Sequence, residues 1–211
     1  MEKSFWHQRW ETDRIGFHGS QPNPLLLAHF PELSVPEYGR VFIPLCGKTL
    51  DIAWLLSKGH RVVGAELSEL AIQQLFEDLG IEPDISDLGE LKHYSADDID
   101  IFVGDVFDLT PTLLGPVDAI FDRAAFVALP EEMRSAYAPH IAHISGNAPQ
   151  LLITFEYDAS QVDGPPFSIP GDEVRQRYGN SYHLSTLTKV DVAGGMKGVA
   201  AKERVWWLKP R

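Results

Sequence analysis

Gly47 and Glu66 are the first residues whose types and spacing suggest chemistry. Gly47 follows the apolar run "RVFIPL" (40–45), and Glu66 lies at the end of the next apolar run, 19 residues after the glycine. A glycine turn followed at about 20 residues by a strand-end carboxylate is typical of sheets that bind a ribose, because the carboxylate accepts hydrogen bonds from its hydroxyls. A carboxylate in that position can equally face solvent, so the spacing alone leaves both interpretations open.

The turn around Gly47 excludes two common nucleotide sites. Gly47-Lys48-Thr49 matches the end of a P-loop, but Phe42 stands where that loop needs its first glycine, and Pro44 still belongs to the apolar run. A dinucleotide site asks for three glycines near the pyrophosphate, and only Gly47 is present. A ribose-binding pattern without a pyrophosphate loop indicates S-adenosylmethionine.

Two further strand ends carry polar residues. Asp105 and Val106 follow the apolar run 99–103, and at the same edge of a sheet they could hold an adenine ring, although Asp105 could as easily cap a turn. Arg123 lies near the end of the run 117–125 and could favour an anionic acceptor. The alternative for Asp122-Arg123 is a local ion pair, which contributes little if it is exposed.

The elements that must position these residues alternate along the chain. Apolar runs predict strands at 40–45, 61–67, 99–105, 117–125 and 150–158, with helices over about 50–58, 69–80 and 130–144 between them and a polar, acidic loop after Gly80. Ser68 is a helix cap and Gly59 and Gly80 are helix stops. The tail, 182–192 and 201–209, alternates like two antiparallel strands joined through Gly194-Gly195.

This order predicts one α/β domain over 1–211, with a doubly wound, Rossmann-like sheet that is mostly parallel and ends in an antiparallel C-terminal hairpin. Residues 1–30 lie outside the alternation. The stretch "SFWHQRWETDR" (4–14) is helical in pattern, and Asn23-Pro24 is a cap and first-turn pair for another helix. We expect 1–30 to form a helical lid on the ligand-binding edge of an α/β core at 38–211.

Bulk properties limit the partners. A formal net charge of −12 argues against sequence-independent binding of nucleic acid and favours a small-molecule partner. The charged start and the lack of a long apolar run predict neither a secretory signal nor a membrane span, so we expect a cytoplasmic protein. Cys46, the single cysteine, is expected to be a packing residue. His140 and His143 are weak evidence for a metal, and we expect none.

Several motifs together resemble one family over nearly the whole chain. They are "FWHQRWETDRIGFH", "PLCGKTLDIAWLLSKGHRVVGAELSELA", "GDVFDL", "DRAAFVALP", "YAPHI" and "GPPFSI". In this order they resemble the bacterial form of the thiopurine S-methyltransferase family. The resemblance implies a class I methyltransferase fold that transfers a methyl group from S-adenosylmethionine, leaving S-adenosylhomocysteine, to the sulfur of an aromatic or heterocyclic thiol. Bacterial relatives are also associated with methylating selenium and tellurium species.

The same resemblance implies a set of site residues. Cofactor contacts fall on Trp6, Trp10, Leu45, Glu66, Asp105, Val106 and Arg123, to which the turn argument adds Gly47. Phe17 is expected near the acceptor, and Phe167 in the stiff "GPPFSI" loop (164–169) could stack on the acceptor ring. Arg123 is the candidate for the catalytic role of favouring a thiolate. The two tryptophans share one helix face, where they could cover a sulfonium or simply dock the helix.

The chain departs from the family between its last two strands. Family members carry a longer segment there with an arginine that reaches the acceptor, whereas this chain has "DVAGGMKGVAAKE" (191–203), in which Lys197 could serve as the cation. Three other functions remain open: an NAD-dependent dehydrogenase with a degenerate loop, a sensor that binds S-adenosylmethionine without catalysis, and a methyltransferase acting on another small nucleophile. We expect a monomer.

Overall fold

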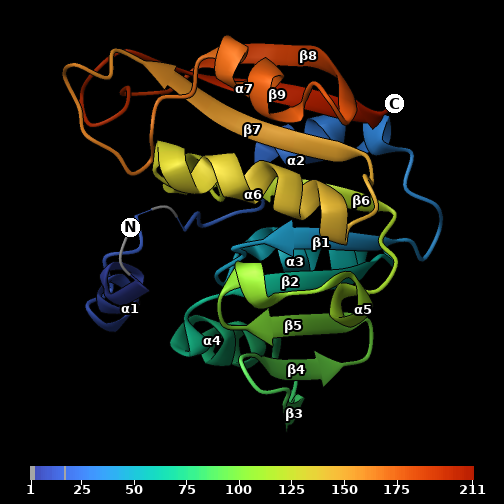
Figure 1. Ribbon diagram of the computed structural model, residues 1–211. Helices are drawn as coiled ribbons and strands as arrows, with labels where there is room; N and C mark the ends of the chain where they lie inside the picture. The colour runs from blue at the N-terminus through green and yellow to red at the C-terminus, as the bar shows by residue number, and fades with distance from the viewer. Residues whose placement is uncertain (1–2, 17) are drawn as a thin grey trace.

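A nine-stranded sheet forms the centre of the computed structural model, which describes residues 3–16 and 18–211. The strand order is β3-β4-β5-β2-β1-β6-β7-β9-β8 (Figure 1). The strands are β1 (Arg40–Pro44), β2 (Arg61–Glu66), β3 (Asp84–Asp87), β4 (Lys92–Ala96), β5 (Ile99–Val103), β6 (Ala119–Arg123), β7 (Gln150–Tyr157), β8 (Tyr182–Asp191) and β9 (Ala201–Pro210).

The direction of the chain reverses between β1 and β6. From β1 the chain moves outward in one direction through β2 and β5, and later in the other through β6 and β7, all paired in parallel. The helices that leave β1 and β6 therefore diverge and leave a crevice at the carboxyl ends of these two strands, which is where doubly wound sheets bind ligands. The predicted mostly parallel sheet with an antiparallel C-terminal hairpin is confirmed.

Helices cover both faces of the sheet (Figure 1). They are α1 (Lys3–Glu11), α2 (Pro24–His29), α3 (Leu50–Ser57), α4 (Glu69–Leu79), α5 (Pro111–Leu114), α6 (Glu131–Ile144) and α7 (Gly171–Tyr178), with short 3-10 turns η1 (Phe30–Leu33), η2 (Val106–Asp108) and η3 (Phe126–Ala128). One core cluster joins α6 and α7 to one sheet face, and a second joins α2, α3 and α4 to the other. Successive strand residues alternate between the clusters, as Val41 and Phe42 do.

The predicted helix ends are confirmed by their hydrogen bonds. The Ser68 side chain accepts from the N–H of Ala71 at the start of α4, and Gly80 ends that helix in the left-handed region with φ of 67°. Asn23 caps α2 through the N–H groups of Leu25 and Leu26, with Pro24 in the first turn. These local signals fix where the chain enters and leaves the layers around the sheet.

The two N-terminal helices occupy different places. Helix α1 lies beyond the carboxyl ends of the parallel strands, as expected for a lid (Figure 1). Helix α2 was expected in the same cover, but its Leu26 is fully buried in the cluster beneath the sheet with Phe30 and Leu33. The apolar "LLLAHF" stretch (25–30) explains the difference, because it buries more surface against the sheet face than a position at the rim would allow.

The acidic loop expected after Gly80 is in fact a hairpin. Strands β3 and β4 pair antiparallel, and β4 continues the sheet beside β5. All four residues of β3 are exposed, so the strand lacks the alternation that would have revealed it. At the opposite edge, β8 pairs with β9 through a register shift between Thr186 and Thr188. No helix within the described ranges is long and apolar enough to cross a membrane.

Candidate active site

A cavity of about 490 Å³ opens at the carboxyl ends of β1, β2, β5 and β6 beneath α1. It lies at the crevice created by the reversal of the chain between β1 and β6. Its lining brings together residues that are far apart in the sequence, and most of the predicted site residues are among them. These are Trp6, Trp10, Leu45, Gly47, Glu66, Asp105, Val106 and Arg123, together with Lys197.

Glu66 is held rigidly at the end of β2. Its Oε2 accepts a hydrogen bond from the N–H of Gly47 at 2.8 Å and its Oε1 accepts one from the N–H of Ser68 at 2.9 Å. The side chain is 7% exposed, which excludes the solvent-facing alternative. Burial raises the pKa of the Glu66 carboxyl, while the backbone donors of Ser68, Gly47 and Leu67 act against that shift. Each oxygen keeps acceptor capacity for a further donor in the cavity.

Gly47 is required by both backbone conformation and space. Its φ is 51°, in the left-handed region where a side chain is strained. A Cβ at this position would lie 3.0 Å from Cζ2 of Trp10, so the helix of the lid packs directly on the turn. Leu45, Ala124 and Lys197, which also line the cavity, have positive φ without being glycine. Backbone strain of this kind concentrates at functional sites, where the surrounding structure maintains it.

Asp105 connects the lid to the sheet. Its carboxylate forms an ion pair with Lys3 of α1 at 2.9 Å. It also accepts a hydrogen bond from the N–H of Phe107 and so caps η2, which agrees with the turn-capping alternative for Asp105. The Lys3 ammonium is attracted to Asp105, which raises the pKa of the lysine. The next residue, Val106, is buried, and its carbonyl accepts from Nε2 of His140 at 2.7 Å.

Asp122 and Arg123 point to opposite faces of the sheet, as neighbours on a strand do. The fully buried Asp122 carboxylate accepts from the Tyr137 hydroxyl at 2.8 Å and from the N–H of Phe126 at 3.1 Å, and burial raises its pKa to about 6. Arg123 lines the cavity instead. On β9, burial raises the pKa of Glu203 and the positive charge of Arg123 opposes this. These contacts do not resemble the local Asp122-Arg123 ion pair that the sequence left open.

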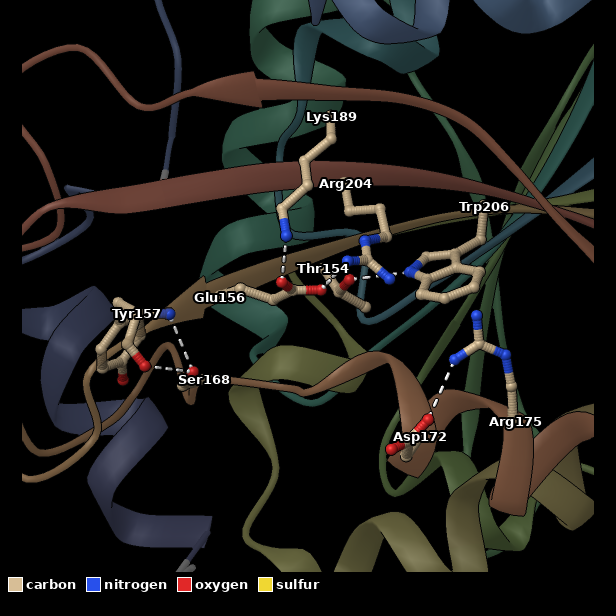
Figure 2. A network of polar contacts seen from close by, with 9 residues as sticks. All are labelled: Thr154, Glu156, Tyr157, Ser168, Asp172, Arg175, Lys189, Arg204 and Trp206. Atoms are coloured by element: carbon tan, nitrogen blue, oxygen red, sulfur yellow. Dashed lines mark hydrogen bonds and ion pairs between the residues drawn. The ribbon is translucent and has the colours of Figure 1, made fainter.

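The "GPPFSI" loop forms one wall of the cavity through Pro165 and Pro166. Two residues hold it against the end of β7: the Tyr157 hydroxyl donates to the Pro166 carbonyl at 2.6 Å, and Ser168 Oγ accepts from the N–H of Tyr157 at 2.9 Å and donates to its carbonyl at 2.8 Å. Figure 2 shows Tyr157 and Ser168 side by side in this arrangement. Backbone pairing adds to these contacts, since the N–H of Ile169 donates to the Phe155 carbonyl at 2.7 Å.

Strand β7 is in turn fastened to the C-terminal hairpin. Glu156 lies between Lys189 of β8 and Arg204 of β9, and Arg204 reaches it at 2.7 Å (Figure 2). Two residues earlier on β7, Nε1 of Trp206 donates to Thr154 Oγ1 at 2.9 Å within the core. The hairpin loop beyond carries Met196 and Lys197 to the cavity, where Nζ of Lys197 donates to the Asp163 carbonyl at 2.8 Å.

Phe167 packs against its own loop and against Arg134. The described lining of the cavity includes the two prolines of its loop but not Phe167. Its ring turns back against Gly164, whose Cβ would approach it to 2.4 Å, and lies 5.6 Å from the guanidinium carbon of Arg134. The role of Phe167 in stacking on the acceptor stays a prediction that this geometry does not favour. Phe17, the other predicted acceptor residue, falls outside the described residues.

Arg134 supports the cavity wall that the "GPPFSI" loop forms. The guanidinium is buried, pairs with Glu173 of α7 at 2.7 and 3.1 Å, and donates to the Leu129 carbonyl at 2.7 Å. It also lies over Phe126 at 5.9 Å. Phe167 donates its N–H to the Val127 carbonyl at 2.7 Å, which joins the two segments that flank Arg134. Arg134 therefore fixes η3 and the proline loop relative to each other.

Sequence reasoning missed several lining residues. They are His18, Met133, Phe155 and Met196, of which Met133 lies in α6 and Met196 in the β8–β9 loop. Only the fold brings them together, and no spacing in the sequence relates them to Glu66 or Arg123. His18 could have been noticed, because it ends the "FWHQRWETDRIGFH" motif.

Cys46 behaves as the packing residue that the sequence indicated. It is buried at 6% exposure behind the turn, its Sγ would lie 2.8 Å from a Cβ on Gly64, and burial raises the pKa of its thiol. His140 donates to Val106, and His143 is exposed on α6. Across residues 3–16 and 18–211, no group of three or more His, Cys, Asp or Glu side chains is arranged to hold a metal ion.

Comparison with known proteins settles the family. The sequence model described as thiopurine S-methyltransferase (TPMT) matches residues 1–209. The chain belongs to the thiopurine S-methyltransferase family. Curated relatives named thiopurine S-methyltransferase include those of Xanthobacter autotrophicus, 52% identical over 99% of both chains, and Teredinibacter turnerae, 53% identical over 99% of this chain and 97% of the relative. Membership of this family makes the chain a methyltransferase that uses S-adenosylmethionine.

Solved structures agree on the fold. A methyltransferase from Anabaena variabilis matches with a TM-score of 0.66 at 13% identity, covering 99% of this chain and 95% of that one. The 1,6-didemethyltoxoflavin-N1-methyltransferase of Burkholderia thailandensis, crystallised with 1,6-didemethyltoxoflavin and S-adenosylhomocysteine, matches with 0.65 at 15% identity, covering 98% and 87%. The predicted Rossmann-like methyltransferase architecture of the thiopurine S-methyltransferase family is confirmed.

Proposed function

We propose that the chain transfers a methyl group from S-adenosylmethionine to the sulfur of an aromatic or heterocyclic thiol, such as a thiopurine. The observation that carries this proposal is the composition of one cavity. A rigid buried carboxylate, Glu66, faces it from one side, while Arg123 faces it among apolar side chains on the other. The names of the curated relatives support the thiopurine acceptor.

The cofactor fits the half of the cavity around Glu66. Because backbone donors fix the buried Glu66 oxygens and leave acceptor capacity on them, these oxygens are suited to accept the ribose hydroxyls as well. Gly47 leaves room at the turn, and Asp105 and Val106 are placed to hold the adenine. Leu45 and Arg123 complete this half, and Trp6 and Trp10 cover it from α1. The open acceptor capacity of Glu66 is the structural evidence for this fit.

The protein's own task in the reaction is mainly to position two partners. S-adenosylmethionine supplies an electrophilic methyl carbon when it is bound. Arg123 would hold the acceptor sulfur as a thiolate by its fixed positive charge, which makes it the proposed catalytic residue. Pro165, Pro166 and Met133 would enclose the flat ring and exclude water. Lys197 adds a second positive charge at the outer rim of the cavity, and we propose Phe17 as a further contact of the acceptor.

We also propose the domain organisation, the oligomeric state and the cellular location of the enzyme. One sheet carries both core clusters, which supports a single domain over 1–211, and we propose that this domain acts as a monomer. The lone, buried Cys46 suits a reducing compartment such as the cytoplasm.

The test is methyl transfer to 6-mercaptopurine, measured as release of S-adenosylhomocysteine. Wild type should turn over, and Arg123→Ala should lose roughly tenfold or more in kcat/KM because a positioned positive charge is removed. Arg61→Ala, at the exposed amino end of β2, is the matched control and should retain activity.

Calorimetric titration with S-adenosylhomocysteine separates the possible failures. Binding without methylation of any thiol would contradict the thiol acceptor and direct the search to selenium or tellurium species or another small nucleophile. A selenium or tellurium acceptor would indicate a role in metalloid resistance. The absence of cofactor binding in a folded protein would contradict the assignment of this cavity.

A further inference from the structure

His18 faces the cavity from the segment between α1 and α2. It is half-buried and lines the cavity. Its N–H donates to the Ile15 carbonyl at 2.7 Å, and the segment is anchored further along where the N–H of Asn23 donates to Asp51 Oδ1 at 2.6 Å. Hydrogen bonds therefore hold the backbone at His18 itself and again at Asn23.

Charged residues from several elements act on the His18 imidazole. Lys48 and Asp51 come from the turn after β1 and the start of α3, Asp78 comes from α4, and Arg123 comes from the end of β6. Lys48 itself pairs with Asp78 at 3.3 Å. His18 and Arg123 line the same cavity, so the imidazole shares it with the guanidinium proposed to hold the acceptor sulfur.

These surroundings keep the imidazole neutral. Burial is the largest effect that lowers the pKa of His18, and the positive charges of Lys48 and Arg123 lower it further, while Asp78 and Asp51 act in the opposite direction. Since an unperturbed histidine titrates near pH 6.5, a lowered pKa leaves one ring nitrogen able to accept a proton at neutral pH.

We propose that His18 is the general base that removes the proton from the acceptor thiol. This role rests on the proposed thiol methylation. The S–H bond breaks, its proton goes to an imidazole nitrogen, and its electron pair remains on sulfur. That sulfur bonds to the methyl carbon as the bond from carbon to the donor sulfur breaks and leaves its electrons there. The imidazolium, close to two fixed positive charges, then releases its proton to water.

The base and Arg123 have complementary parts in this scheme. Arg123 stabilises a thiolate once it exists, whereas His18 generates it from a thiol that is protonated at the ambient pH. An acidic heteroaromatic thiol is already ionised and gains little from a base. A less acidic thiol depends on one, and general-base catalysis typically contributes about 10² to 10⁴ in rate.

The experiment uses substituted thiophenols whose thiol pKa values span the assay range, with wild type, His18→Gln and His18→Asn. The exposed His143→Gln on α6 is the matched control. For a thiol assayed well below its pKa, kcat/KM of either His18 variant should fall by at least about tenfold. The loss should shrink to less than about twofold once the pH exceeds the thiol pKa, because a thiolate needs no base. Calorimetric affinity for S-adenosylhomocysteine should not change.

The outcomes separate the two proposals. A loss of the same size for every thiol and at every pH, or no loss at all, overturns the role of His18 and leaves thiol methylation intact. A wild type that binds S-adenosylhomocysteine but methylates none of the thiols overturns the proposed function and the role of His18 with it. Two variants are used so that a folding failure of one does not remove the comparison.

Discussion

The two halves of the cavity are built by different means. The half around Glu66 is fixed by the sheet: its turn and strand end are joined by backbone hydrogen bonds from Gly47 and Ser68. The half beyond Arg123 is assembled from loops, which are held by a few backbone hydrogen bonds and by side chains, such as Tyr157 against Pro166 and Lys197 against Asp163. The first arrangement suits a constant cofactor. The second can change with its loops while the sheet stays as it is.

The largest expected effect concerns the support of the acceptor half. Arg134→Met should lower the free energy of unfolding by about 3 to 4 kcal/mol, because the part-buried Glu173 keeps only its 3.7 Å contact with Arg177 and the Leu129 carbonyl loses its donor. In the fraction that folds, KM for the acceptor should rise more than the dissociation constant of S-adenosylhomocysteine. Urea denaturation and steady-state kinetics measure the two effects.

A matched double variant sharpens this test. Arg134→Met with Glu173→Leu removes both charges and should recover much of the lost stability. If the acceptor KM stays raised while stability returns, Arg134 positions the wall as well as stabilising the fold. A double variant as unstable as the single one would contradict the ion-pair explanation.

The pH dependence of the free energy of unfolding should come in part from the buried Asp122. Its pKa is raised to about 6 in the folded chain from an ordinary 3.8, so the folded state holds the proton more tightly than the unfolded state does. The stabilisation that the protonated Asp122 contributes to the fold therefore falls as pH rises from about 4 to about 6. Relative to Asp122→Asn, wild type should lose about 3 kcal/mol of unfolding free energy across that range. Urea titrations at several pH values measure this difference, and parallel curves for the two proteins would contradict it.

Glu66→Ala tests the cofactor half. Loss of a rigid charged acceptor should weaken S-adenosylmethionine binding by about 1.5 to 3 kcal/mol, or roughly 10- to 150-fold, measured by calorimetry. The exposed Glu77→Ala on α4 serves as the control. Unchanged affinity in a folded Glu66 variant would show that the ribose is not held here and would remove the distinction between the halves.

Lys197→Ala should have the smallest effect. The side chain is exposed at the rim, so its charge is screened, and kcat/KM for a thiopurine should fall by about twofold to fivefold. Cofactor affinity should not change, and Lys202→Ala on β9 is the control. A thiopurine kcat/KM equal to that of wild type would end the idea that Lys197 replaces the family's arginine.

The half of the cavity around Glu66, which we propose holds the cofactor, was readable from the sequence because its signals are local. Glu66 stands at a fixed distance from Gly47, and the buried runs of β1 and β2 surround that pair. The acceptor half was not, since Met133 and Met196 meet only after the chain has folded. Phe167 shows most clearly what the sequence does not reveal about a side chain. Its loop was recognised, but the ring turns back against Gly164, and it can do so only because Gly164 has no side chain.

The fold, too, could be predicted where its signals are local in the sequence. Strands with buried runs and helices with caps were predicted within a few residues. The hairpin of β3 and β4 was not, because its first strand, "DISD", buries nothing. Helix α7 was also not anticipated: only Val174 and Tyr178 bury an apolar side chain, and charged residues fill the rest. Elements that are stabilised mainly by pairing with a neighbour leave little trace in hydrophobic periodicity.

The two outer strands of the sheet have a consequence for how the protein behaves in concentrated solution. An open strand edge can recruit a strand from another copy and start an aggregate. Strand β3 is short, with Asp84 and Asp87 exposed at its ends, and β8 is interrupted by its register shift and carries Lys189 and Asp191. Short length, charge and a distorted ladder all oppose such recruitment. Both ends of the sheet are therefore protected against adding further strands.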